Sequence, residues 1–383
     1  MSAAALDLAR DTIFVGLSGS HAHGTARSGS DVDLRGVCVA PLALRLSLFE
    51  RFEQWEGGVP PGLEQELVAR LAAHPSAARN LGVRRECVVY DIAKFLRLLA
   101  GANPNALEIL FTHPGDWLHE TPVWRRLHAE RQRFLTREVQ RTYLGYALAQ
   151  LRKIATHRAW LLSPPSQAPT RKELGLPDTP ALSREERQRV DAYLAERARN
   201  YGVSDLELPP AARATIEERI DRLVEDLAVA RRETRDETLA ATAAAAVGLP
   251  HGVIEILLLE RKYEARRRHY ASYLAWQTER NPERAALERA HGYDTKHGMH
   301  LMRLLRTGLE LLESGELHVR RPDAEELRRV RAGALSYEDL VAEAEALVAR
   351  MQRRASQSVL PERVAPEFVD ALCLELFELH RPT

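Results

Sequence analysis

The chain has 383 residues and no formal net charge, because 54 Lys and Arg residues balance 54 Asp and Glu residues. This balance excludes a uniformly basic nucleic-acid-binding protein, so any RNA-binding surface must be a local patch. The three cysteines, Cys38, Cys87 and Cys373, lie far apart, which argues against a disulfide framework or a cysteine-based zinc site and favours a reducing compartment. No signal-peptide pattern or bilayer-length apolar run is evident, so we expect a cytoplasmic protein that makes no membrane contact.

The first predicted element is a buried strand from Thr12 to Leu17, a short run of apolar and β-branched residues. It leads into a tight turn at Gly19 and Ser20. Gly19 lets the backbone approach a phosphate closely, and Ser20 can donate from its N–H and its hydroxyl to a phosphate oxygen. Because Gly24 is not followed by Lys and Ser or Thr, the loop is not a Walker A motif.

A second predicted strand carries two carboxylates, Asp31 and Asp33. Strand periodicity places both on one face, while Val32 and Leu34 point to the other. Magnesium prefers hard oxygen ligands and is usually held by a few carboxylates together with substrate phosphates. By itself Asp-x-Asp is typical of a solvated turn. The ordered set of strand, Gly-Ser, ten-residue gap and Asp-apolar-Asp instead indicates nucleotidyl transfer.

Composition then changes along the chain. A strand from Glu86 to Tyr90 and an amphipathic helix from Asp91 to Leu99, with Asp91 as its N-cap, close a region in which strands and helices alternate. From Pro122 onward nearly every segment has helical spacing. We therefore predict an α+β domain over residues 1–115 and a mostly α-helical domain over residues 116–383. The helical part is expected to include a long helix from Arg137 to Arg158 and a tightly packed one at Ala240 to Ala246.

Two segments of the helical part combine basic and other polar groups. Arg266, Arg267 and Arg268 alternate with aromatic residues that could stack on RNA bases, although the same aromatic spacing suits core packing. Farther along, Asp294 is expected to cap a helix whose first turn holds Lys296 and His297. Capping explains Asp294 but not the clustered cations, so we expect Lys296 and His297 to bind the triphosphate or the RNA end.

Together these segments resemble the DNA polymerase β nucleotidyltransferase superfamily, and within it the RlaP branch of predicted nucleotidyltransferases associated with RNA repair ligases, related to the YcgL group. The resemblance runs from about residue 12 to about residue 345. It is carried by Gly19 to Thr25, Ser30 to Val37, Asn103 to Glu108, His157 to Pro165, Pro169 to Arg171 with Gly175 to Pro177, and Gly292 to His297.

The resemblance implies a polymerase-β-type catalytic domain with a mixed sheet and adds roles for single residues. Superfamily members normally hold their metal with a third carboxylate on a later strand, and Glu86 aligns with it better than Asp91, which capping already explains. A helix after the catalytic domain often supplies a cation to the triphosphate, which makes Lys153 a candidate. The implied catalytic and metal ligands are Asp31, Asp33 and Glu86.

The expected function is that of an enzyme of the EC 2.7.7 type. With two Mg²⁺ ions, for which Mn²⁺ could substitute, it would add nucleotides from an NTP to an RNA 3′ end, such as that of a damaged tRNA, and release pyrophosphate. An RNA ligase of a repair system would be its partner. Two alternatives remain open: nucleotidylation of a small molecule or protein, and a catalytically silent nucleotide-binding partner of a repair complex.

Overall fold

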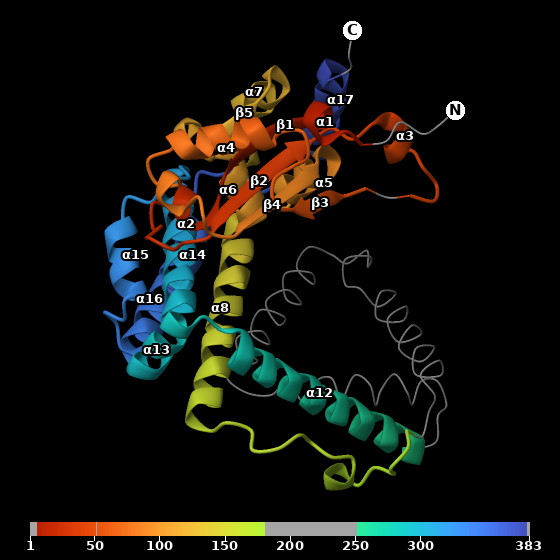
Figure 1. The fold of residues 1–383 in the computed structure, drawn as a ribbon, viewed down its shortest axis with the longest axis vertical. Coiled ribbons are helices and arrows are strands. Elements are labelled where there is room, and N and C mark those ends of the chain that lie inside the picture. Colours follow the sequence, from red (N-terminus) through yellow and green to blue (C-terminus); the bar gives the residue numbers. More distant parts are fainter. Residues whose placement is uncertain (1–5, 51, 181–250, 381–383) are drawn as a thin grey trace. The chain divides into compact units, whose positions relative to one another are not determined.

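The computed structural model describes residues 6–50, 52–180 and 251–380 (Figure 1). It divides the chain into two compact units, one formed by Met1–Leu162 with Asn281–Thr383 and the other by Ser163–Arg280. These units do not divide at the predicted boundary between residues 115 and 116, and whether function divides there stays a prediction. The helix predicted at Ala240 to Ala246 lies outside the described residues.

The first unit contains a five-stranded mixed sheet, as the sequence predicted (Figure 1). Its strands are β1 (Thr12–Leu17), β2 (Val32–Cys38), β3 (Gln54–Gly57), β4 (Arg85–Asp91) and β5 (Trp117–Glu120). Their order is β3-β4-β2-β1-β5, in which β2 and β4 are parallel and the other neighbours antiparallel. The edge strand β5 follows residue 115, so the sheet continues beyond the predicted end of the first domain.

Helices cover both faces of the sheet. The α-helices before the gap are α1 (Leu8–Asp11), α2 (Gly19–Ala22), α3 (Leu42–Arg45), α4 (Glu64–Ala73), α5 (Ile92–Ala100), α6 (Pro104–Leu110), α7 (Pro122–Ala129) and α8 (Val139–Leu162). Those after it are α13 (Pro282–His291), α14 (Thr295–Ser314), α15 (Ala324–Arg331), α16 (Tyr337–Ala355) and α17 (Pro366–His380). Short 3-10 turns are η1 (Ala78–Asn80), η2 (Pro114–Asp116) and η3 (Arg131–Phe134).

The strands alternate between two hydrophobic clusters, which explains why β1 is buried along its whole length. Val15 and Leu17 pack with Leu67 and Leu71 of α4 on one face. Phe14 packs on the other face, in the larger cluster that includes α5, α8 and α14. A strand that is buried on both faces loses the apolar-polar alternation of a half-exposed strand, so its sequence reads as a continuous apolar run.

The long helices α8 and α14 pack against each other below the sheet (Figure 1). The α14 helix begins where the sequence predicted, because the Asp294 carboxylate accepts hydrogen bonds from the N–H groups of Lys296 and His297. Leu301, Leu304 and Leu305 are buried on its inner face. Lys296 thus lies one and a half turns before residues that pack beneath the sheet.

The second unit contains η4 (Lys172–Leu174) and α12 (His251–Glu279). Arg171 binds the buried carboxylate of Glu260 through two hydrogen bonds, one of them 2.9 Å long. Tyr273 is buried, whereas Arg266, Arg267 and Arg268 are exposed. None of the described helices, in either unit, is both long and apolar enough to cross a bilayer.

Candidate active site

The turn after β1 lies directly beside the second predicted aspartate. Ser18 donates its backbone N–H to the carbonyl oxygen of Asp33 over 2.8 Å, and Gly19 follows with φ of +58°. A Cβ atom on Gly19 would overlap Oδ2 of Asp33. Only glycine fits there, because the left-handed backbone and the space left by the absent Cβ are both required. The Ser20 carbonyl closes the turn by accepting from the N–H groups of Thr25 and Ala26, each at 2.9 Å.

Strand pairing brings one candidate third carboxylate to Asp33 and keeps the other away. In the parallel ladder, Glu86 is the register partner of Asp33, and Asp91 is the partner of Cys38 at the far end of β2. Register partners point to the same face of a sheet. Asp91 is buried and caps α5 by accepting from the Ala93 N–H at 2.9 Å. The geometry therefore supports Glu86 over Asp91 as the third acid.

The three carboxylates approach one another without forming a closed cluster. Asp31 is exposed just before β2, Asp33 is half-buried, and the Glu86 side chain is 49% exposed and binds Arg84 at 2.5 Å. Burial raises the pKa of Asp33, and the negative charges of Asp31 and Glu86 raise it further. Hard oxygen donors that repel one another at one end of two strands fit a divalent cation such as Mg²⁺.

The α14 helix brings a lysine to these carboxylates. Burial lowers the pKa of Lys296, whereas the charges of Asp31 and Asp33 raise it, and Lys296 in turn lowers the pKa of Asp33. Val37 lies four residues after Asp33 on β2, so the two side chains point to the same face of the sheet. Val37 belongs to the same hydrophobic cluster as Leu301 of α14. Lys296 is therefore on the side of the sheet that Asp33 faces, although 263 positions separate them in the numbering.

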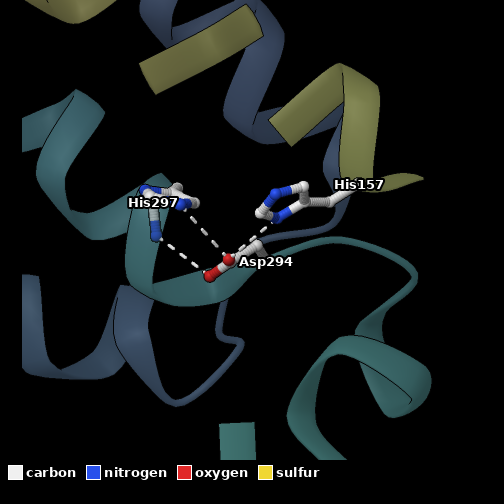
Figure 2. A group of neighbouring side chains, drawn as sticks. All are labelled: His157, Asp294 and His297. Atoms are coloured by element: carbon white, nitrogen blue, oxygen red, sulfur yellow. Dashed lines mark hydrogen bonds and ion pairs between the residues drawn. The ribbon is translucent and has the colours of Figure 1, made fainter. Parts of the chain in front are cut away.

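Asp294, two positions before Lys296, gathers His157 and His297 (Figure 2). Its Oδ2 lies 3.3 Å from Nδ1 of His157 on α8 and 3.5 Å from Nε2 of His297. His297 Nδ1 pairs with Gln150 Oε1 at 2.8 Å. Burial lowers the pKa of His297 to about 4, so the ring is neutral at pH 7. Hydrogen bonds with His157 and Arg284, together with the charge of Arg284, hold the pKa of Asp294 well below its usual range, against the effect of burial.

This second group has the donor set of a metal site but not its charge balance. Among the described residues, it is the set of three acidic, His or Cys side chains whose ligand atoms all lie within 4.8 Å of one another. However, the Arg284 guanidinium already binds the same Asp294 oxygen, with Nε at 3.1 Å. A metal ion would have to displace that cation. We therefore assign Asp294 the role of holding Arg284, His157 and His297 in place. This role does not require a metal ion at Asp31 and Asp33.

The last sequence candidate, Lys153, is exposed on α8, and its charge helps to lower the pKa of His297. The structure thus places Lys153 near His297 and Lys296 near the aspartates.

Sequence reasoning missed the group that holds the turn in position. Glu108 of α6 is buried and binds both His23, at 2.9 Å, and Arg303 of α14. Arg328 of α15 donates to the Gly24 carbonyl at 2.7 Å. The Asn-Pro-Asn-Ala-Leu-Glu segment ending at Glu108 was the available signal, but nothing local in it shows that Glu108 is buried. The turn that carries Gly19 is therefore fixed to helices from the far end of the chain.

Comparisons with known proteins agree with this arrangement. Residues 4–161 match the model of the family RlaP, described as the RNA repair pathway DNA polymerase beta family. The match covers less than half of the chain and ends one residue before Leu162, where the first segment of the first unit ends. Neither the curated proteins nor the solved structures gave a match. Residues 4–161 are therefore similar to the RNA repair pathway DNA polymerase beta family, a similarity that supports assignment to the polymerase-β nucleotidyltransferase superfamily.

Proposed function

We propose that this protein is a Mg²⁺-dependent nucleotidyltransferase that adds nucleotides from an NTP to an RNA 3′ end and releases pyrophosphate. The observation that carries the proposal is the convergence of Gly19, Asp33 and Glu86 at one end of β2, in a segment that matches an RNA repair polymerase family. A broken tRNA is the acceptor that this pathway suggests. The three free thiols suit the cytoplasm as the compartment.

Each residue has a role that follows from its position. Asp31, Asp33 and Glu86 would hold divalent cations, which lower the pKa of an attacking hydroxyl and neutralise phosphate charge when bound. Gly19 lets the backbone of the turn lie against the Asp33 carboxylate, and the N–H of Ser20 would donate to a phosphate bound there. Lys296 would add a positive charge close to Asp31 and Asp33, and Asp294 keeps neutral His297 oriented near it.

In this reaction the RNA 3′ hydroxyl attacks the α-phosphorus of the NTP. A new P–O bond to the RNA forms while the bond between the α-phosphorus and the bridging oxygen of pyrophosphate breaks. The hydroxyl proton leaves to solvent or to an acidic side chain of the site. The chain's contribution is to align the hydroxyl with the bond that breaks and to balance charge on the departing pyrophosphate.

The direct test is transfer of label from each α-labelled NTP to total RNA in the presence of Mg²⁺. Asp31→Ala and Asp33→Ala should lower the rate by on the order of a thousandfold or more, because a principal metal ligand is lost. Asp370→Ala, which removes an exposed acid on α17, is the matched control and should keep full activity. If the third ligand is Glu86, Glu86→Gln should impair transfer more than Asp91→Asn, after correction for the fraction of folded protein.

The outcome also separates the alternatives. If the label appears on a small molecule or on the protein itself, but not on RNA, that labelled species is the acceptor and RNA is not. NTP binding without transfer to any acceptor would identify a silent nucleotide-binding protein. Transfer that persists at the wild-type rate in the Asp31 and Asp33 double variant would rule out this site altogether.

A further inference from the structure

Four basic side chains from four separate segments lie close enough near the start of α14 to interact electrostatically, and one of them, Arg284, binds the α14 N-cap residue Asp294. Arg27 comes from the loop after α2, Arg284 from α13, Lys296 from the first turn of α14, and Arg331 from the end of α15. The ends of α13 and α15 are in contact, because a Cβ atom on Gly333 would overlap the His291 ring. In a chain with no net charge, these four form a local cluster of basic side chains.

Two of these four cations have carboxylate partners and two do not. Arg27 binds Glu283 at 3.0 Å, and Arg284 binds Asp294. Within residues 6–50, 52–180 and 251–380, the side chains of Lys296 and Arg331 form no hydrogen bond or ion pair. Both of these side chains are half-buried.

An unpaired half-buried cation costs folding free energy, and like charges nearby increase the cost. Burial lowers the pKa of Arg331, and the charges of Arg27 and Arg284 lower it further, against the opposing effect of Glu283 and Asp294. Burial likewise lowers the pKa of Lys296, as do the charges of Arg284 and Arg331. Lys296 also lies at the positive end of the α14 dipole, where a cation is disfavoured. An anion held between the two side chains would remove these costs.

The neighbouring carboxylates indicate which anion fits. Lys296 interacts with Asp31 and Asp33, so the space around it adjoins the proposed cation-binding acids. If those acids hold the ions that contact the α-phosphate, the rest of the polyphosphate chain extends toward the cations. A linear polyphosphate offers several charged oxygens in a row, which matches one ammonium and one guanidinium better than a single phosphate does.

We propose that Lys296 and Arg331 together bind the β- and γ-phosphates of the nucleotide, with Arg331 as a ligand that the sequence did not indicate. This subsite rests on the proposed function, because it places the triphosphate at Asp31 and Asp33. Arg331 lies at the C-terminal end of α15, and its neighbour Arg328 holds the Gly24 carbonyl. The same helix thus both fixes the loop of Gly19 and supplies the phosphate ligand.

The test uses inorganic tripolyphosphate with Mg²⁺ and the full-length protein, with binding measured by calorimetry and by thermal shift. Arg331→Gln should weaken binding by about tenfold or more, because a charge-assisted contact is lost. Arg329→Gln, an exposed arginine on the same helix, is the matched control and should bind as the wild type does. Lys296→Gln should weaken binding to a similar extent as Arg331→Gln.

A second readout separates ligand binding from a structural role. Without ligand, Arg331→Gln should unfold at the wild-type temperature or above it, because repulsion among the cations falls. If it does not fold, Arg331→Lys is compared in its place, and it should retain part of the binding because it keeps the charge. Equal tripolyphosphate binding by the wild type, the Arg331 variant and the Arg329 variant would overturn the subsite.

The subsite and the proposed function can fail separately. If tripolyphosphate binding does not depend on Arg331 while transfer still requires Asp33, the proposed subsite is wrong and the proposed nucleotidyltransferase activity is still supported. If binding depends on Arg331 and Lys296 but no NTP supports transfer to any acceptor, the polyphosphate subsite stands and nucleotidyl transfer fails.

Discussion

Asp33 shows how a single residue of a binding site can lower the stability of the folded protein. It lies half-buried beside Asp31 and Glu86, and burial together with their charges raises its pKa. A carboxylate in such a place destabilises the folded state whenever it is ionised and has no cation. Such a residue is explained by what it binds rather than by what it packs against.

We therefore predict that Asp33→Asn stabilises the metal-free protein at pH 8. A raised folded-state pKa means that the cost is fully present above that pKa and disappears below the unfolded value, which is 3.8 for an ordinary Asp. The melting-temperature gain should accordingly shrink as the pH is lowered toward 4. Added Mg²⁺ or Mn²⁺ should stabilise the wild type but not the variant. A variant that melts lower than the wild type at pH 8 without metal would contradict this account of Asp33.

At the scale of elements, the important contact is between the loop after β1 and the helices that follow it much later in the chain. Burial alone would raise the pKa of Glu108, but Arg303 and His23 outweigh that effect and lower it to about 2. The pKa of His23 is lowered by burial, so its ring is neutral and Arg303 supplies the charge. One buried carboxylate thus ties the loop of Gly19 to α14, which carries Lys296.

Glu108→Gln should destabilise the protein by about 3–5 kcal/mol, because it leaves the Arg303 charge buried without a counterion. The lowered pKa predicts that the stabilising effect of Glu108 is complete above 4.5, the ordinary value, and is lost as the pH falls toward 2. Urea titration at pH 7 and pH 3 measures both effects. Glu325→Gln removes an exposed carboxylate on α15 and should hardly change the midpoint. Equal midpoints for the two variants would show that the buried ion pair does not stabilise the loop.

At the scale of the whole molecule, the chain has two compact units and zero net charge, so an RNA acceptor needs a local surface. On α12 of the second unit, Arg266, Arg267 and Arg268 are exposed, whereas the aromatic residue Tyr273 is buried. The arginines are therefore available to phosphates, but Tyr273 is occupied in packing rather than free to stack on bases. This favours contact with the RNA backbone over base stacking at Tyr273.

Replacing Arg266, Arg267 and Arg268 by Gln should weaken RNA binding and make it less sensitive to salt. If all three meet phosphates of a single strand, the slope of log affinity against log salt should fall by roughly 2. Replacing Arg350, Arg353 and Arg354, three exposed arginines on α16, is the matched control. Filter binding of a labelled RNA at several salt concentrations measures the slope. The same slope in both triple variants would show that α12 does not bind RNA. The conclusions from the tripolyphosphate and transfer assays would still stand, because they do not depend on α12.

The sequence by itself determined the local features of this protein. The run from Thr12 to Leu17 forms a strand because β-branched and apolar residues favour it, and Asp294 caps α14 because a short carboxylate side chain reaches the free N–H groups there. The mixed sheet and the similarity of residues 4–161 to the RNA repair polymerase family could also be predicted from sequence, because the spacing of characteristic residue types can be recognised without coordinates.

Only the tertiary structure decided which distant residues meet. The register of β2 against β4 places Glu86, and not Asp91, beside Asp33, because a parallel ladder fixes partners by position and not by residue type. The packing of α14 beneath the sheet brings Lys296 to the aspartates. Nothing in the local sequence separates Arg331 from the exposed Arg329, because whether a cation is paired depends on neighbours contributed by other elements.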